Sequence, residues 1–448
     1  MTYISIVKGK VIETTGGNYN TYAGEDIITS SAKSITEVGV EKGVLYAKNP
    51  KLPPAPEIIG KCVVQFRPYK NWEGEYGFDW IRTGDTGYRG DVWYNTIIGK
   101  NRNAAGNIDQ STNYAKNIVP DNKEYNKIVN TFQKLVLKKE LATFYAVPKM
   151  TLMKGKTAQL IIKTKILKEP NKLQFKYNAK YFQIGGFTND NIDSKQKGNK
   201  TLDLTIKCLD YFATDQNIDI LADDKICGRL TILKNNITYN ANVVFVPVQT
   251  NLSGKNRVGD IKAGEMSRMQ NIMNQMYIES DIEQSNRLDL TGILTGTWFK
   301  MQYSKFNPVN KKNEIEIKND FHTYLDGKFF GEAKNAKYKT YFRVYVFGES
   351  AGGLNGIAED VGNGADSALV FPGRIKSDPS LSSATHEVLH TMGVYHTFDN
   401  DSKFTFIQDQ IDNIMDYSHW SGIKRISTSQ FQWSIIQGRL AGTKKVNK

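Results

Sequence analysis

The segment best suited to chemistry is a group of three histidines and a glutamate near the C-terminal end of the chain. His386 and His390 are four residues apart, so on an α-helix both imidazoles project from one face and can bind one metal ion. Gly393 follows three residues later, where a residue free to adopt positive φ can end the helix and turn the chain back. His396 then supplies a third ligand. Three neutral imidazoles leave one position open on zinc, which is typical of catalytic rather than structural sites.

Glu387 lies beside the first of these histidines and is not expected to bind the metal. Its carboxylate can take a proton from a zinc-bound water and pass it to the leaving amine, while zinc lowers the pKa of that water. The group therefore predicts a zinc-dependent endopeptidase that hydrolyses proteins or peptides. The alternative is a structural or binding component of a secretion apparatus with a non-catalytic zinc site. Glu387 separates the two hypotheses, because a structural site has no use for a base there.

The spacing from His386 to His396 is the HExxHxxGxxH signature of the metzincins, in which a methionine turn follows downstream. Met415 lies nineteen residues after His396, within Asn-Ile-Met-Asp-Tyr, and is predicted to form an apolar floor under the histidines. Tyr417 can place its hydroxyl near the metal or the tetrahedral intermediate; otherwise it is an ordinary half-buried tyrosine. Because the ligand set is complete, His419 is expected at an exposed or substrate-side position.

Within the metzincins, the C-terminal half resembles the pappalysin and cytophagalysin branch. The resemblance rests on the run HTMGVYHTF, on NIMDY and on the helix expected after it, and it covers about residues 240–445. It implies a zinc endopeptidase with an α/β fold, a cleft over the metal and a closing helix near 427–440. The resemblance assigns the ligand, base and Met-turn roles to His386, His390, His396, Glu387, Met415 and Tyr417.

The same resemblance implies a substrate-binding element ahead of the histidine helix. Residues 353–358 resemble the loop of that branch. The segment 366–370 resembles the edge strand that holds substrate in extended form, which makes Ser367, Ala368 and Leu369 candidate substrate-binding residues.

Two features depart from the family pattern. Leu389 replaces the small glycine usual before the second histidine, and the cysteines expected around the Met-turn are missing, which favours folding in a reducing compartment. Calcium is common in that branch. Candidate oxygen ligands are present at Asp399, Asn400, Asp401 and Asp412. Acidic loops are most often solvated surface, so calcium stays an open alternative beside the single zinc.

A chain of 448 residues is too long for one ordinary core. Residues 1–50 carry short β-rich runs and precede a proline-rich connector at 51–56. Residues 57–148 are rich in aromatic side chains and predict a mixed or all-β domain. Residues 149–235 alternate in the strand manner, which predicts an immunoglobulin-like β-sandwich. Residues 237–448 change to an α/β pattern. The predicted fold class is therefore multidomain, with β-rich N-terminal modules before a metzincin-type zincin domain.

Apolar periodicity also predicts individual elements. Helical spacing indicates helices near 123–137 and 260–280, and strands are expected at 241–248 and 341–347. The three cysteines are too few for a disulfide framework. Cys208 and Cys227 are either bridged or two buried free thiols.

Amino-acid composition limits the classes of partner and the cellular location that we expect for this protein. The net charge of +13 is spread along the chain without a basic block, so nucleic-acid binding is not expected. No apolar run approaches the roughly 20 residues of a membrane span. The first residues do not form a Sec-type signal peptide. This layout is similar to that of toxins and effectors of one-step secretion machines. We therefore expect a protein made in the cytoplasm and exported by a specialised route, with the N-terminal modules binding a component of the machine; otherwise it is cytoplasmic.

Overall fold

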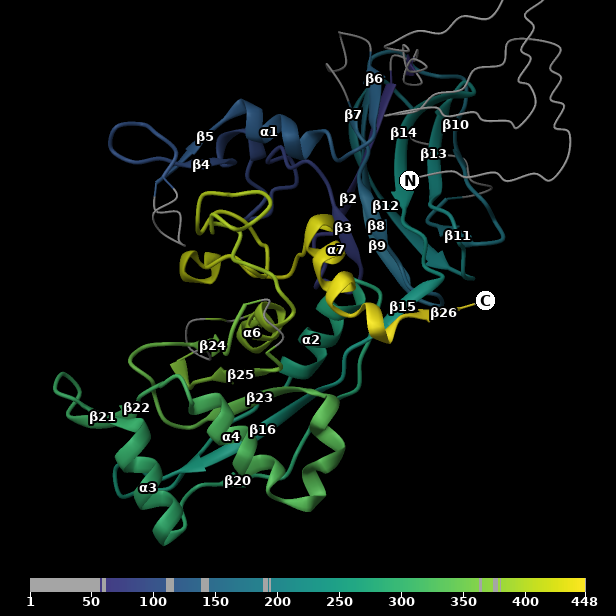
Figure 1. The fold of residues 1–448 in the computed structure, drawn as a ribbon. Coiled ribbons are helices and arrows are strands. Elements are labelled where there is room, and N and C mark those ends of the chain that lie inside the picture. The colour runs from purple at the N-terminus through teal and green to yellow at the C-terminus, as the bar shows by residue number, and fades with distance from the viewer. Residues whose placement is uncertain are drawn as a thin grey trace, which may run out of the picture. The chain divides into compact units, whose positions relative to one another are not determined.

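The computed structural model divides the chain into two units, Met1–Pro56 and Glu57–Lys448. It describes residues 57–58, 62–109, 117–137, 145–187, 192, 195–361, 365–373, 378 and 380–447 (Figure 1). The β-rich segment expected at 1–50 and the connector at 51–56 lie outside the described residues.

Two sheets share one core in the first half of the described chain. One sheet has the order β11-β12-β9-β2, formed by β2 (Cys62–Pro68), β9 (Thr157–Ile166), β11 (Phe182–Gly185) and β12 (Gly198–Cys208). The other has the order β10-β13-β14-β8-β3, formed by β3 (Gly77–Asp79), β8 (Lys149–Thr151), β10 (Leu173–Lys176), β13 (Gln216–Ala222) and β14 (Lys225–Ile232). Strands β9, β12, β13 and β14 lie within 149–235, where the sequence alternates in the strand manner.

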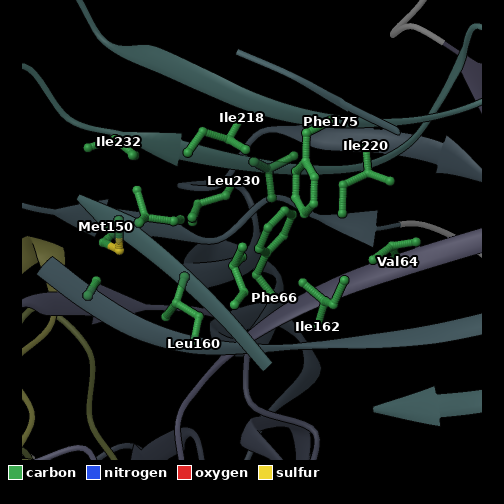
Figure 2. Packing of buried hydrophobic residues seen from close by; sticks show 14 of the residues in the cluster. Val64, Phe66, Met150, Leu160, Ile162, Phe175, Ile218, Ile220, Leu230 and Ile232 are labelled. Carbon is green, nitrogen blue, oxygen red and sulfur yellow. The ribbon is translucent and has the colours of Figure 1, made fainter. Parts of the chain in front are cut away.

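Alternation on β9 explains how these strands pack. Ala158, Leu160 and Ile162 are buried, whereas the residues between them are exposed or half-buried, as expected for a strand with one face toward a core. Phe66 of β2 lies in the same core as Phe175 of β10 (Figure 2). Burial of each such large side chain contributes roughly 1.5–3 kcal/mol to stability.

The boundary expected at residue 148 does not separate two cores. Strand β2 pairs antiparallel with β9 along seven residues, and β3 pairs antiparallel with β8. Segments 57–148 and 149–235 therefore contribute strands to the same two sheets. The buried face of β2 was already visible as an apolar run, but the sequence does not show which strand it pairs with.

The three cysteines are buried and free. Cys208 accepts a hydrogen bond from Asn235 Nδ2 at 3.2 Å, so its environment is separate from that of Cys227. Burial raises the pKa of the Cys227 thiol, and its hydrogen bond with Cys62 raises that pKa further. Of the two alternatives for Cys208 and Cys227, the structure has the free thiols.

A mixed sheet with the order β17-β16-β23-β25-β24 organises the second half. Strands β16 (Val243–Thr250), β23 (Phe342–Phe347) and β25 (Ser367–Val370) are parallel, and β24 (Gly356–Ala358) is antiparallel to β25. The short strands β17 (Arg257–Val258), β19 (Ile282–Gln284) and β20 (Leu288–Asp289) all pair with β16.

Helices cover both faces of this sheet (Figure 1). The core on one face includes residues of α2 (Glu265–Asn274), α6 (Ser383–Thr391) and α7 (Gln430–Arg439). The core on the other face includes residues of α3 (Ile293–Tyr303) and α4 (Phe321–Phe330). All eight residues of β16 are buried, because the strand is covered on both faces. Such strands have apolar residues along their whole length rather than at alternate positions.

Short sheets complete the fold. They consist of β1 (Glu57–Ile58), β6 (Lys134–Leu137) and β7 (Tyr145–Ala146); β4 (Gly99–Asn101) and β5 (Ile118–Pro120); β15 (Ile237–Asn240), β18 (Ile278–Glu279) and β26 (Lys445–Val446); and β21 (Ser304–Asn307) and β22 (Lys312–Ile315).

The predicted helices are present but shorter than expected. Helix α2 lies within 260–280, and its apolar stripe is fully buried, as for Met269 and Met273. Helix α1 (Asn122–Val129) stops well before residue 137, because Leu135 belongs to β6 and pairs with Tyr145 of β7. Strand pairing thus overrides helical spacing there. None of the helices in the described part of the chain has the length and apolar character needed to cross a membrane.

Candidate metal centre

Helix α6 carries the first two histidines and is buried along its whole length. After it, Gly393 adopts φ +93°, a left-handed conformation that suits glycine. Its N–H donates to His390 O at 2.9 Å, and Val394 N–H donates to Leu389 O at 3.1 Å. These bonds close the helix C-terminus and turn the chain back, as the spacing predicted. The turn brings His396 to the face that carries the other two imidazoles.

The three imidazoles converge through their Nε2 atoms. His390 Nε2 lies 3.1 Å from His386 Nε2 and 3.0 Å from His396 Nε2. Two nitrogens that bind one tetrahedral zinc lie about 3.3 Å apart, so the spacing is close to that of a zinc site. Within the described residues, these histidines are the one group of His, Cys, Asp and Glu side chains placed to hold a metal ion.

Each Nδ1 atom has an acceptor of its own. His386 Nδ1 lies 2.7 Å from Ile414 O, and His390 Nδ1 lies 2.7 Å from Val394 O. His396 Nδ1 lies 2.9 Å from Asp399 Oδ2. With the proton on Nδ1, each ring donates to its acceptor and points the Nε2 lone pair inward. Three lone pairs this close repel one another unless a cation lies between them, so the donor set fits a bound metal.

His386 and His390 are held in the neutral form, which is the form that binds metals. Burial lowers the pKa of His390 to about 3, and the neighbouring His396 ring lowers it further. Burial also holds the pKa of His386 well below its usual value, with added contributions from His390 and from the guanidinium of Arg425.

Asp399 orients the third ligand, since its Oδ2 accepts from both Nδ1 and the backbone N–H of His396. We predict that Asp399→Asn lowers metal affinity by about 10- to 100-fold, the usual cost of losing such an outer partner. Competition with a chromogenic chelator measures this affinity. Asp401→Asn, at an exposed position two residues away, is the control. Equal affinities for the two variants would show that Asp399 does not orient the ligand.

Two of the residues considered for calcium, Asp399 and Asp412, have other partners in the structure. Asp399 holds His396, and Asp412 forms an ion pair with Arg82 at 2.6 Å. Asp412 also accepts a 2.6 Å hydrogen bond from Ser427 Oγ. Asp399 and Asp412 therefore support the segments around the histidines.

Glu387 lies under the edge strand β24. A Cβ atom added to Gly356 of that strand would meet the glutamate Cγ at 2.6 Å and Oε1 at 2.7 Å. Only glycine therefore allows this close approach. Burial raises the pKa of Glu387 to about 8, while Arg425 and the Ala358 backbone act in the opposite direction. The sequence placed Gly356 in a loop of interest, but it did not reveal the contact with Glu387.

The candidate substrate-binding residues Ser367, Ala368 and Leu369 are not on an edge. They belong to β25, which pairs with β23 on one side and β24 on the other, and all three are fully buried. Their backbone groups are used within the sheet. The edge is one strand further out, at β24. The sequence could not show this, because the three residues of β24 are too short a run to be recognised as a strand.

Met415 and Tyr417 lie where the Met-turn was expected. Met415 is fully buried, and its carbonyl accepts a 3.1 Å hydrogen bond from Thr397 N–H, directly after His396. The Tyr417 ring is half-buried, with its centroid 4.8 Å from that of His396 and 5.8 Å from that of His386. The turn thus packs against two of the three ligands.

His419 is buried rather than exposed, and its Nε2 lies 3.5 Å from Asn355 Nδ2. Burial lowers the pKa of His419 to about 4, and Arg425 lowers it further. Asn355 precedes Gly356, so His419 lies beside the strand that covers Glu387. It is not a member of the metal-binding group.

A buried ion pair next to His386 escaped the sequence analysis. Arg425, 1% exposed, donates to Asp378 Oδ2 at 2.6 Å and to Asp416 O at 3.1 Å. Its Nη1 also lies 3.3 Å from His386 Nδ1. Burial alone would raise the pKa of Asp378, but Arg425 and neighbouring serine hydroxyls hold it well below its usual range. The only local signal was the run of serines around 380–383, which can cap the start of a helix.

No protein family matches the chain, and no curated protein matches its sequence. The function must therefore be inferred from the histidine group and the residues around it.

Proposed function

We propose that this protein is a zinc-dependent endopeptidase with a metzincin-type catalytic domain, preceded by an immunoglobulin-like sandwich. One observation carries the proposal. Three buried imidazoles point their Nε2 atoms at one another, each with its Nδ1 held by an acceptor, and a buried glutamate lies on the same helix as two of them. Three imidazole ligands leave an open position on zinc, and the adjoining carboxylate is the group that hydrolysis requires.

The histidines and Glu387 have separate roles in the proposed hydrolysis. Zinc, when bound by His386, His390 and His396, supplies a Lewis acid and lowers the pKa of water. Glu387 accepts the proton of the attacking water and returns it to the leaving amine. Its pKa, raised by burial to about 8, makes it a stronger base than an exposed glutamate, and a nearby dication would lower that pKa.

Strand β24 is the element suited to binding substrate. It is the outermost strand of its sheet among the described residues, although the Ala358 backbone already bonds to Glu387. An extended peptide can add to such an edge through main-chain hydrogen bonds. Because Gly356 of this strand touches Glu387, a peptide bound along it would pass close to the base.

Metal removal tests the proposal. We expect the purified full-length protein to contain about one zinc per chain and to cleave members of a library of unstructured peptides, with products identified by mass spectrometry. Treatment with 1,10-phenanthroline should abolish cleavage, and added zinc should restore it.

The structural-zinc alternative predicts a different result. In that case the zinc is present and its removal lowers the unfolding temperature, but no peptide in the library is cut by the zinc-loaded protein. Protein that binds no zinc at all would contradict both hypotheses.

A further inference from the structure

Helix α3 has an apolar face that no other described part of the chain covers. Ile293 and Leu294 are 89% and 86% exposed, and Met301 and Trp298 are 71% and 44% exposed. Together with Lys328 these four residues line one shallow hollow at the surface. The opposite face of the helix is also apolar, with Phe299 and Tyr303 buried in the core. A helix that is apolar on both faces is expected to be buried on both.

The hairpin that follows α3 also exposes large apolar side chains. On β21 and its turn, Phe306 and Val309 are 62% and 91% exposed. From residue 290 to residue 313 the chain contains no aspartate or glutamate. The same stretch contains four exposed lysines, namely Lys300, Lys305, Lys311 and Lys312. The most exposed large apolar side chains of the described protein therefore lie in a segment that carries only positive charge.

We propose that α3 and the β21–β22 hairpin bind the surface of an anionic membrane. In this arrangement Ile293 and Leu294 insert among the acyl chains, Trp298 lies at the level of the headgroups, and the lysines contact lipid phosphates. Protruding apolar residues combined with tryptophan and lysine are the usual composition of interfacial membrane-binding segments. Residues 290–313 contain no carboxylate, and Glu314 of β22 is buried, so the exposed charges of the segment match the negative charge of such a surface. A protein partner would also bury the exposed apolar residues, but it would not explain why all the charged residues between 290 and 313 are lysines.

The position of α3 leaves the metal centre accessible. Helix α3 packs on one face of the mixed sheet, in the core that contains Phe299 and Tyr303, whereas α6 packs on the opposite face (Figure 1). A membrane bound at α3 would therefore not cover the histidines. This inference does not depend on the proposed peptidase activity.

Vesicle binding tests the inference with the full-length protein. We expect co-sedimentation with vesicles of phosphatidylserine and phosphatidylcholine, and little with phosphatidylcholine alone. The double variant Ile293→Ser with Leu294→Ser should weaken binding by about tenfold or more, because two fully inserted side chains are lost. Val446→Ser, at an apolar position that is 62% exposed elsewhere, should bind like the wild type.

A charge variant separates the two contributions. Lys300→Gln with Lys305→Gln should weaken binding and reduce its sensitivity to salt. The pair Lys176→Gln with Lys207→Gln, both at exposed positions of the sandwich, is the matched control. The blue shift of tryptophan emission on adding vesicles should disappear in Trp298→Phe although the other tryptophans remain.

Three outcomes would overturn the inference. The first is no binding to either vesicle type. The second is equal binding to charged and neutral vesicles that the lysine variant does not change. The third is a dimer in sedimentation equilibrium that the Ile293→Ser and Leu294→Ser changes abolish, because the face would then be occupied by a second copy of the chain.

Discussion

Glu387→Gln is expected to lower the rate of peptide cleavage by about a thousandfold, within the range of general-base contributions, while the protein keeps its zinc. Glutamine has nearly the shape of glutamate and can occupy the space beneath Gly356, but it cannot accept a proton from water. The three imidazoles and their acceptors are not altered. Initial rates on the best library peptide, together with zinc content by atomic absorption, measure the two effects separately.

Glu124→Gln is the matched control for this change. Glu124 lies on α1 and is 8% exposed, the same exposure as Glu387, and it pairs with Lys127 rather than facing the metal centre. Its substitution should leave the cleavage rate unchanged. If Glu387→Gln cleaves as fast as the wild type, Glu387 is not the base. If it loses its zinc, the loss of activity would say nothing about proton transfer.

Asp378→Asn is expected to destabilise the fold by about 3–5 kcal/mol, because it leaves the buried charge of Arg425 without a partner. The side chains of the pair are 2% and 0% exposed. Arg425 also touches His386, so the unpaired cation should weaken metal binding as well. Urea denaturation of the zinc-free protein, followed by circular dichroism, measures the change in free energy of unfolding.

The exposed pair between Lys154 and Asp210 is the control for Asp378→Asn. Asp210→Asn should leave stability almost unchanged, because exposed ion pairs contribute little. Adding Arg425→Met to Asp378→Asn should recover part of the loss, since no unpaired charge then remains. A cost for Asp378→Asn no larger than that for Asp210→Asn would contradict the importance assigned to the buried pair.

The pH dependence of this cost has a definite sign. The pKa of Asp378 is held below its usual value in the folded protein. Its contribution is therefore complete above the unfolded pKa of about 4 and is lost only as the pH falls through the lower folded value. The difference in stability between wild type and Asp378→Asn should stay constant from about pH 5 to pH 8.

Local periodicity was sufficient to predict the three histidines that the structure brings together as a possible metal-binding group. The i, i+4 pair on α6 needs only the helix itself, and the turn at Gly393 needs only a residue that tolerates positive φ. Two of the three Nδ1 acceptors are also local, since Val394 O lies four residues from His390 and Asp399 lies three residues from His396. Interactions over so few residues leave little freedom for any other arrangement.

Strand pairing was the main limit on the prediction of the fold. Strand β2 is readable as an apolar run and β9 as an alternating one, yet nothing in either run indicates that they pair across about ninety intervening residues. The same limit applies to β24, whose three residues became the sheet edge in place of β25. Strand pairing depends on which other strands are available as partners. The sequence of a single segment does not contain this information.

Three histidines and one glutamate could thus be singled out before the fold was known, because these residues are related by the geometry of one helix and one turn. Only the tertiary structure decided what surrounds them. Gly356 over the base, Ile414 O behind His386, and the Arg425–Asp378 pair all come from segments distant in sequence. The physical reason is that hydrogen bonds and burial between distant segments depend on the packing of the whole chain, whereas helix geometry depends on neighbours alone.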